Sequence, residues 1–236
     1  MLEMSHVTYA YKLRRRQKKT ALTDVSLQCE PGIFYTIFGP SGSGKTTCLS
    51  LMGGLDQPEQ GEIRIDGKRI GEIGENKLRR GYVAYIFQDY QLFTYMTAVE
   101  NVMAALQIAE PRTKRHDLKK RAEEILFSLG LDAREIERRV TRLSGGQMQR
   151  VAVARALAVD ARYILADEPT GNLDSAATDV MIGLLRELVE KWNKCVVVVT
   201  HSLRVRDASD VSFMFSDGKL EETVQMQTAG RAGGKG

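Results

Sequence analysis

Residues 39–47 read GPSGSGKTT and match the phosphate-binding pattern G-x-x-x-x-G-K-[ST]. The apolar residues 33–38 before this loop predict a buried strand, and the residues after it predict a helix over 45–52 that ends at Gly53 and Gly54. Glycines let backbone N–H groups close around a phosphate, and the helix N-terminus adds partial positive charge. The stretch therefore predicts an α/β nucleotide-binding fold of the P-loop type.

The side chains of this phosphate loop suit a nucleotide accompanied by a metal ion. Lys45 reaches the β- and γ-phosphates, and the Thr46 hydroxyl is a ligand for Mg²⁺. A dinucleotide-binding loop would need a glycine where the chain has Thr47. The candidate nucleotide-binding residues are Gly39, Pro40, Ser41, Gly42, Ser43, Gly44, Lys45, Thr46 and Thr47.

Two acidic residues follow another buried-type strand, predicted over residues 163–166. In an open parallel sheet, ligands lie at the carboxyl ends of the strands. Asp167 is therefore a candidate Mg²⁺ ligand, directly or through a water. Glu168 is left to act as the general base that polarises an attacking water.

A second phosphate-binding turn lies at residues 143–147, which read LSGGQ ahead of a helix predicted over 148–158. Ser144 follows Lys45 by 99 residues, and no second P-loop accompanies it. Two phosphate-binding turns for one nucleotide site predict that one of them is used on another subunit.

The rest of the chain predicts a mostly parallel sheet core with two additions. One is an antiparallel β subdomain that includes a hairpin turn at Asp66-Gly67, and the other is an inserted α-helical subdomain over about 89–160. We expect one domain over residues 1–224 and a disordered tail over 225–236. The remaining strands are predicted over 7–11, 21–27, 62–65, 83–87, 195–200, 211–215 and 219–223, and a further helix over 176–192.

The composition is that of a globular chain with one basic loop. Of 236 residues, 43% are hydrophobic and 27% are charged, and the longest apolar run is six residues, against the roughly 20 that span a membrane. Residues 12–19 hold six basic residues, which leaves 28 basic against 30 acidic residues elsewhere. The net charge of +4 is therefore no sign of nucleic-acid binding.

The cysteines and the N-terminus argue against several other classes of protein. Cys29, Cys48 and Cys195 are odd in number and form no C-x-x-C pair, so we expect neither a disulfide framework nor a zinc site. The first residues lack an apolar signal core, so we expect the protein in the reducing cytosol.

Three motifs in order, GPSGSGKTT, LSGGQ and LADEPTGNLD, make the chain resemble the ATP-binding subunits of ABC transporters over about residues 1–224. The resemblance implies an ATPase that binds ATP and Mg²⁺, pairs head to tail with a second, identical copy, and powers a separate membrane permease. It places the protein on the cytoplasmic side of the cell membrane, held there by the permease.

The resemblance also implies roles for single residues. Gln88 would contact Mg²⁺ and sense the γ-phosphate, His201 would hold the γ-phosphate, and Tyr11 would stack on adenine. Asp174 would face the other subunit, whose ATP site would be completed by Ser144, Gly145, Gly146 and Gln147. The implied catalytic residues are thus Lys45, Gln88, Glu168 and His201, and the implied metal ligands are Thr46, Gln88 and Asp167.

Some of these residues have an ordinary structural alternative. Gln88 and His201 could be strand-end residues with satisfied hydrogen bonds, and Tyr9 lies on the same strand face as Tyr11, so either tyrosine could be core. Cys48 is either a thiol whose modification blocks ATP binding or an inert buried residue. The basic loop 12–19 either meets lipid headgroups or an acidic partner, or is only solvated.

The stretch EPTGNLD, residues 168–174, resembles one group of the family, which serves macrolide export, lipoprotein release, cell division and bacitracin-type peptide resistance. In that group the permease commonly has four spans and a large external domain. The resemblance thus implies export or mechanical coupling to an external domain. A signalling ATPase of the cell-division type, an importer ATPase and a soluble ABC-type ATPase remain alternatives.

The stretch QLFTYMT after Gln88 would line the groove that receives a cytoplasmic helix of the permease. The candidate contacts are Tyr90, just before this stretch, and Leu92, Phe93 and Tyr95 within it. Ordinary packing between subdomains is the alternative.

Overall fold

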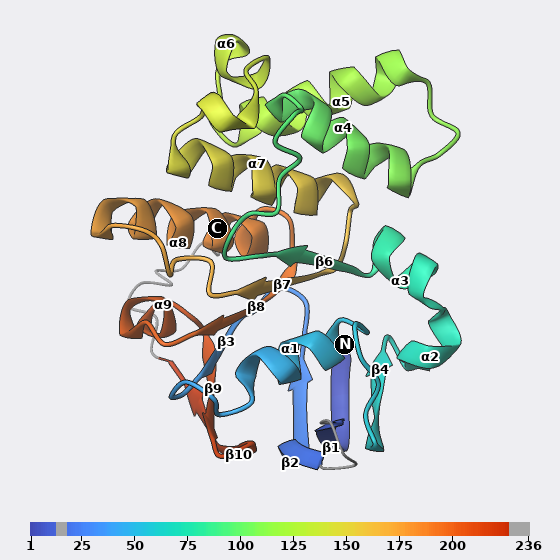
Figure 1. The fold of residues 1–236 in the computed structure, drawn as a ribbon, viewed down its shortest axis with the longest axis vertical. Helices are drawn as coiled ribbons and strands as arrows, with labels where there is room; N and C mark the ends of the chain where they lie inside the picture. Colours follow the sequence, from blue (N-terminus) through green and yellow to red (C-terminus); the bar gives the residue numbers. More distant parts are fainter. Residues whose placement is uncertain (13–17, 227–236) are drawn as a thin grey trace, which may run out of the picture.

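The computed structural model describes residues 1–12 and 18–226, and its centre is a six-stranded sheet (Figure 1). The strand order is β10-β9-β3-β8-β7-β6, and every neighbouring pair is parallel except β9 with β10. The predicted mostly parallel core is therefore confirmed. The strands are β3 (Phe34–Phe38), β6 (Val83–Ile86), β7 (Tyr163–Asp167), β8 (Cys195–Thr200), β9 (Val211–Ser216) and β10 (Lys219–Gln225).

The register of this sheet brings three sequence-distant segments to one edge. Phe38 of β3 pairs with Thr200 of β8, and Asp167 of β7 pairs with Val199. The phosphate loop, the acidic pair and His201 all follow these strand ends directly. The predicted site therefore lies where an open parallel sheet places its ligands.

The predicted antiparallel subdomain is a four-stranded sheet in the order β2-β1-β4-β5. Its strands are β1 (Leu2–Lys12), β2 (Lys18–Cys29), β4 (Gln60–Ile65) and β5 (Lys68–Arg69). Strand β1 begins five residues earlier than predicted, because register shifts around His6 interrupt the alternation that marks a strand. Of the basic loop, residues 13–17 lie outside the described part, and the flanking Lys12, Lys18 and Lys19 are exposed.

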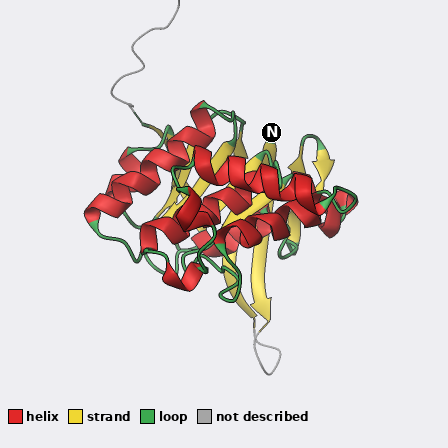
Figure 2. Cartoon of the chain, turned by 90° about the horizontal axis from the view of Figure 1, so that it is seen from above, coloured by secondary structure: helices red, strands yellow, loops and turns green. Residues whose placement is uncertain are grey.

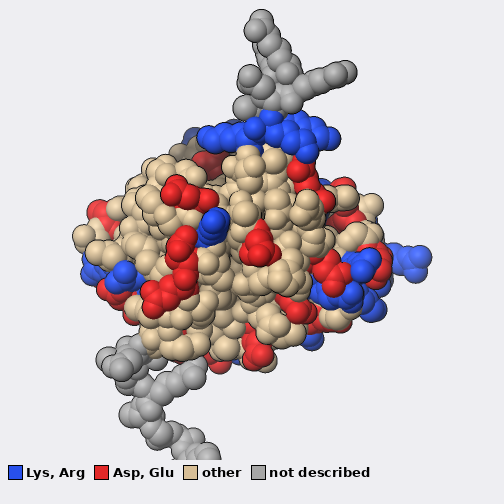
Figure 3. Space-filling model, turned by 90° about the horizontal axis from the view of Figure 1, so that it is seen from below, with Lys and Arg blue, Asp and Glu red and all other residues tan. Residues whose placement is uncertain are grey.

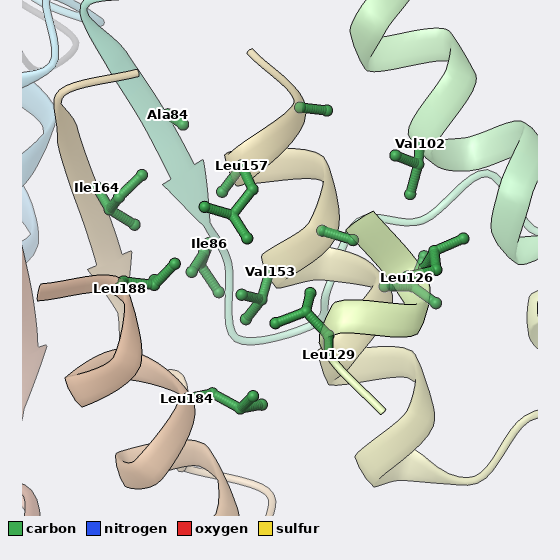
Figure 4. Packing of buried hydrophobic residues seen from close by; sticks show 14 of the residues in the cluster. Ala84, Ile86, Val102, Leu126, Leu129, Val153, Leu157, Ile164, Leu184 and Leu188 are labelled. Atoms are coloured by element: carbon green, nitrogen blue, oxygen red, sulfur yellow. The ribbon is translucent and has the colours of Figure 1, made fainter. Parts of the chain in front are cut away.

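The helices cover both faces of the main sheet (Figures 1 and 2). Helix α1 (Lys45–Met52) shares an apolar cluster with the antiparallel sheet and with residues of β3, β7 and β8. On the other face, α7 (Gly145–Ala158) packs over β6, and α8 (Ser175–Glu190) packs over β8 and β3. Val153, Leu157 and Leu188 lie in one apolar cluster with Ile86 and Ile164 (Figure 4).

Helix α7 links this sheet to the inserted helices. It contacts α4 (Ala98–Ala109) and α5 (Arg115–Ser128) as well as β6 and α8, so a single apolar cluster runs from the insertion into the sheet. The insertion also holds α6 (Ala133–Ile136) and the 3₁₀ helix Val140–Arg142. The helical character predicted for this region is confirmed, and α7 starts three residues earlier than predicted because Ser144 caps it.

Three short helices were not predicted: α2 (Ile70–Ile73), α3 (Glu75–Gly81) and α9 (Leu203–Asp207). Each is too short to show a full apolar period. Strand β10 runs on to Gln225, which pairs with Val211, so Gln225 is not part of a disordered tail; residues 227–236 of that expected tail lie outside the described part. Among the described residues, no helix is long and apolar enough to cross a bilayer.

Candidate functional site

The phosphate loop is shaped by its glycines and closed by its lysine. Gly44 has a φ of 97° at the start of α1, and an added Cβ there would lie 2.5 Å from the carbonyl oxygen of Ala21. Gly42 also has a positive φ, and a Cβ there would meet open space. The buried Lys45 Nζ donates to the carbonyl oxygens of Gly39, at 2.9 Å, and Pro40, at 2.8 Å. The ammonium is thus held across the loop, where an anion would meet it.

The two predicted metal ligands nearest this loop face each other. Thr46 Oγ1, from α1, donates to Asp167 Oδ1, at the end of β7, over 3.2 Å. Burial raises the pKa of Asp167, and nearby Glu168 adds to the rise, while the hydrogen bond from Thr46 and the charge of Lys45 oppose it. Mg²⁺ prefers oxygen ligands, and the Thr46 hydroxyl beside the Asp167 carboxylate supplies two of them.

Glu168 and His201, which sequence analysis assigned separately, form a pair. His201 Nδ1 lies 2.8 Å from Glu168 Oε1. The second carboxylate oxygen of Glu168 is buried and has no hydrogen-bond partner among the described residues. The Glu168 backbone is left-handed, with a φ of 45°, and its N–H donates to Val199 O at 2.9 Å. The carboxylate therefore has one oxygen fixed by a histidine and one left to accept a proton.

Gln88 reaches this turn from the neighbouring strand β6. A Cβ added to Gly171 would lie 2.9 Å from Gln88 Nε2. Because Gly171 has no side chain, the Gln88 amide can lie beside the Glu168 turn. The sheet edge therefore brings together Lys45, Thr46, Gln88, Asp167, Glu168 and His201.

Two residues that sequence analysis did not predict hold the loop after Gln88. The fully buried Asn101 of α4 accepts from Phe93 N–H at 2.9 Å and donates to the carbonyl oxygens of Phe93 and Thr97. Arg155 of α7 donates to Gln91 O at 2.6 Å, and its guanidinium lies 5.4 Å from the centre of the Phe93 ring. The one signal in the sequence was a polar residue, Asn101, on an apolar helical stripe.

The same loop borders a half-open groove of about 270 Å³. Phe93 is 39% exposed and lines this groove, whereas Tyr95 is 67% exposed and lines a separate hollow beside Met96 and Glu100. The groove is lined by residues that include Tyr85, Phe87, Tyr90, Phe93, Ile108 and Arg155. Tyr90 and Phe93, predicted as permease contacts, therefore lie in a concave surface; Leu92 packs against the core cluster.

The two tyrosines of β1 have different environments. Tyr9 is buried, and its hydroxyl donates to Asp56 at 2.7 Å. Tyr11 is 43% exposed and shares a 2.8 Å hydrogen bond with the hydroxyl of Thr47 in the phosphate loop. Tyr9 is therefore the core residue, and Tyr11 offers an open ring beside the loop, as a residue that stacks on a base would.

The Ser-Gly-Gly turn at residues 143–147 stands apart from these groups. Ser144 caps α7 by accepting from Gln147 N–H, and Gln147 in turn accepts from Ser144 N–H at 2.8 Å. Ser144 and Gly145 are exposed, and within the described residues no hydrogen bond joins this turn to the phosphate loop. Asp174 likewise caps its own helix, α8, by accepting from Ala177 N–H.

Two secondary predictions are also placed by the structure. Cys48 is fully buried with its Sγ 3.7 Å from Met4 Sδ, and burial raises the pKa of the thiol to about 12, which favours the inert alternative.

Figure 3 shows basic side chains gathered along one edge of the molecule. Of the described residues in the basic loop, Lys18 pairs with Glu59 at 2.8 Å.

Comparison with known proteins adds independent findings. Residues 22–171 match the family of ABC transporters. The chain is 40% identical over 220 residues to the uncharacterised ABC transporter ATP-binding protein YclH of Bacillus subtilis, which covers 93% of this chain and 95% of that protein. It is 40% identical over 206 residues to the lipoprotein-releasing system ATP-binding protein LolD of Francisella tularensis, covering 86% and 88% of the two chains.

A solved structure is similar over nearly the whole chain. The dimeric post-hydrolysis structure of the ATP-binding cassette MJ0796, from Methanocaldococcus jannaschii, bound to ADP and Pi, has a TM-score of 0.86 and 37% sequence identity. The match covers 97% of this chain and all of that chain.

Proposed function

The chain belongs to the ABC transporter family as an ATP-binding, ATP-hydrolysing subunit, and from this premise we propose how its residues divide the work. One domain over residues 1–224 binds ATP, with Lys45 on the β- and γ-phosphates, the backbone of residues 39–47 around them, and Tyr11 on the adenine. The observation that carries the assignment is the meeting of Thr46 with Asp167, and of Glu168 with His201, at one sheet edge.

The chemistry proposed for this edge is attack of a water on the γ-phosphorus of ATP, which breaks the bond to the β–γ bridging oxygen and releases ADP and phosphate. Mg²⁺ would be held by Thr46, Asp167 and Gln88, and when bound it would neutralise charge on the phosphate oxygens. Glu168 accepts the proton of the water through the oxygen that the structure leaves unpartnered. His201 holds the other carboxylate oxygen of Glu168 and donates toward the γ-phosphate, so the two residues orient each other.

The exposed Ser-Gly-Gly turn supports a second part of the proposal. Two identical copies pack head to tail, and Ser144, Gly145, Gly146 and Gln147 of one copy complete the ATP site of the other, with Asp174 facing the partner. The similar MJ0796 cassette is dimeric with ADP and Pi bound. Removal of the γ-phosphate that bridges the copies would then let them separate.

The proposed task of the ATPase is to power a separate membrane permease from the cytoplasmic side of the membrane. The stretch EPTGNLD and the similarity to LolD, a lipoprotein-releasing subunit, support a permease with about four spans and a large external domain. In that arrangement ATP hydrolysis drives export or movement of the external domain. The groove beside Tyr90 and Phe93 would receive a cytoplasmic helix of the permease.

Glu168→Gln tests the assignment of the base. We expect this variant to lower kcat by about 10²–10⁴-fold, the usual worth of a positioned general base, and to bind ATP as the wild type does. Steady-state ATPase rates and ATP titration measure the two quantities. Near-normal turnover in Glu168→Gln would overturn the assignment. Glu190→Gln, at the far end of α8, is the matched control.

A further inference from the structure

One buried side chain of α7 connects the Ser-Gly-Gly turn with the turn that carries Glu168. Gln149 is 1% exposed, and its Nε2 donates to the carbonyl oxygen of Pro169 over 3.2 Å. Pro169 follows Glu168 directly. Gln149 lies only five residues after Ser144, about 7–8 Å along the helix. The two parts of the site are thus joined by little more than one helical turn and one hydrogen bond.

The Glu168 turn needs outside support, because a left-handed backbone is unfavourable for a residue with a side chain. Strand β8 supplies one contact, in which Glu168 N–H donates to Val199 O, and the turn closes on itself where Gly171 N–H donates to Glu168 O at 3.0 Å. Gln149 supplies a contact from α7, on the side of the helical insertion. A shift of α7 is therefore transmitted to the backbone beside Glu168.

Gln149 is a poor residue for stability alone. Its Oε1 is buried and accepts no hydrogen bond from any described residue, and the helix around it is apolar. A buried unpaired oxygen destabilises the folded state, whereas methionine would fill a similar volume without one. Flipping the amide would place its oxygen against the Pro169 carbonyl oxygen, which cannot donate a hydrogen bond. A glutamine therefore contributes one thing here that methionine cannot, the N–H that donates to Pro169 O.

We propose that Gln149 is a positioning residue that couples the Ser-Gly-Gly turn to Glu168 of the same subunit. The inference rests on the proposed function, in which that turn binds the ATP of the partner copy. Engagement of the partner's ATP fixes the start of α7, and Gln149 then holds the Pro169 carbonyl so that the Glu168 carboxylate faces its own site. The general base of each subunit, Glu168, is thereby positioned by the nucleotide that binds to the other subunit.

Gln149→Met and Arg150→Met form a matched pair for the first test. Arg150, the next residue of α7, donates to the carbonyl oxygens of Leu129 and Gly130, so its loss removes the same kind of contact away from Glu168. We expect Gln149→Met to lower kcat about 3–10-fold, the worth of one hydrogen bond, with KM for ATP and the melting temperature little changed. Arg150→Met should lower the melting temperature and leave kcat within about twofold.

A second background separates positioning from a general loss of structure. In Glu168→Gln the base is already absent, so adding Gln149→Met should lower single-turnover hydrolysis no further. Gln149→Asn, whose shorter amide cannot reach Pro169, should behave as Gln149→Met does and serves if the methionine variant folds poorly.

Two results would overturn the proposal: wild-type kcat in Gln149→Met and Gln149→Asn, or the same proportional loss with and without Glu168. Failure of the proposed function shows differently, because the wild type would not hydrolyse ATP, or Glu168→Gln would turn over normally.

Discussion

The edge of the six-stranded sheet and the start of α7 both carry phosphate-binding turns, but only the first is assembled within one chain. At the sheet edge, Lys45, Thr46, Asp167, Glu168 and His201 already contact one another or the loop. At α7, Ser144 and Gln147 satisfy each other and leave the turn exposed. Under the proposed function, this difference predicts that one subunit is enough to bind ATP, whereas hydrolysis needs two.

The variant Lys45→Met should have the largest effect on ATP affinity, because it changes the assembled region. Loss of the ammonium removes charge-assisted contacts to the phosphates, so ATP affinity should fall about 10–100-fold and hydrolysis should fall with it. Equilibrium titration with a fluorescent ATP analogue measures the first effect. The exposed Lys77→Met is the control. If Lys45→Met bound ATP with wild-type affinity, the lysine would not contact the phosphates.

The variant Ser144→Arg should separate the two regions most clearly. A bulky cation at the exposed turn blocks the partner's site without touching the subunit's own loop, so hydrolysis should fall about 10²-fold while ATP affinity is unchanged. Ser128→Arg adds the same side chain at another exposed position and should be neutral. A loss of ATP affinity in Ser144→Arg would mean that the turn serves its own subunit.

The smallest effect is expected at the rim of the assembled region. Tyr11→Ala removes the exposed ring beside Thr47, so KM for ATP should rise about 5–10-fold, the low end of what one base stacked on an aromatic ring contributes, with kcat nearly unchanged. The exposed Tyr95→Ala serves as control in the isolated subunit, because it lies on the helical insertion. Equal KM values for Tyr11→Ala and the wild type would contradict the stacking role.

The sheet edge and the start of α7 also show which features could be predicted from the sequence and which could not. Local patterns predicted the phosphate loop, α1 and β8 well, because apolar runs and glycine punctuation are short-range signals. The strand-end pattern also identified Glu168, and the family resemblance identified His201, but neither predicted their contact, since the two residues are 33 apart and meet only through the pairing of β7 with β8. The residues at the sheet edge were therefore predictable from the sequence, but the contacts between them were not.

Polar side chains inside the fold were the systematic omission: Asn101 and Gln149 are buried, and Arg155 is half-buried. Asn101, Gln149 and Arg155 occupy apolar helical stretches, where a pattern analysis treats a polar residue as an interruption. Each donates to a loop carbonyl oxygen that lies 8 to 64 residues away. Such contacts need the tertiary fold before they can be seen.

The most direct test of a site divided between two subunits is the size of the ATP-bound protein. Glu168→Gln with ATP should sediment as a dimer that holds two nucleotides, since binding without hydrolysis leaves the γ-phosphates between the copies. The same protein with ADP, and the double variant Glu168→Gln, Ser144→Arg with ATP, should sediment as monomers. A monomer of Glu168→Gln at saturating ATP, with one nucleotide bound, would contradict the division of the site.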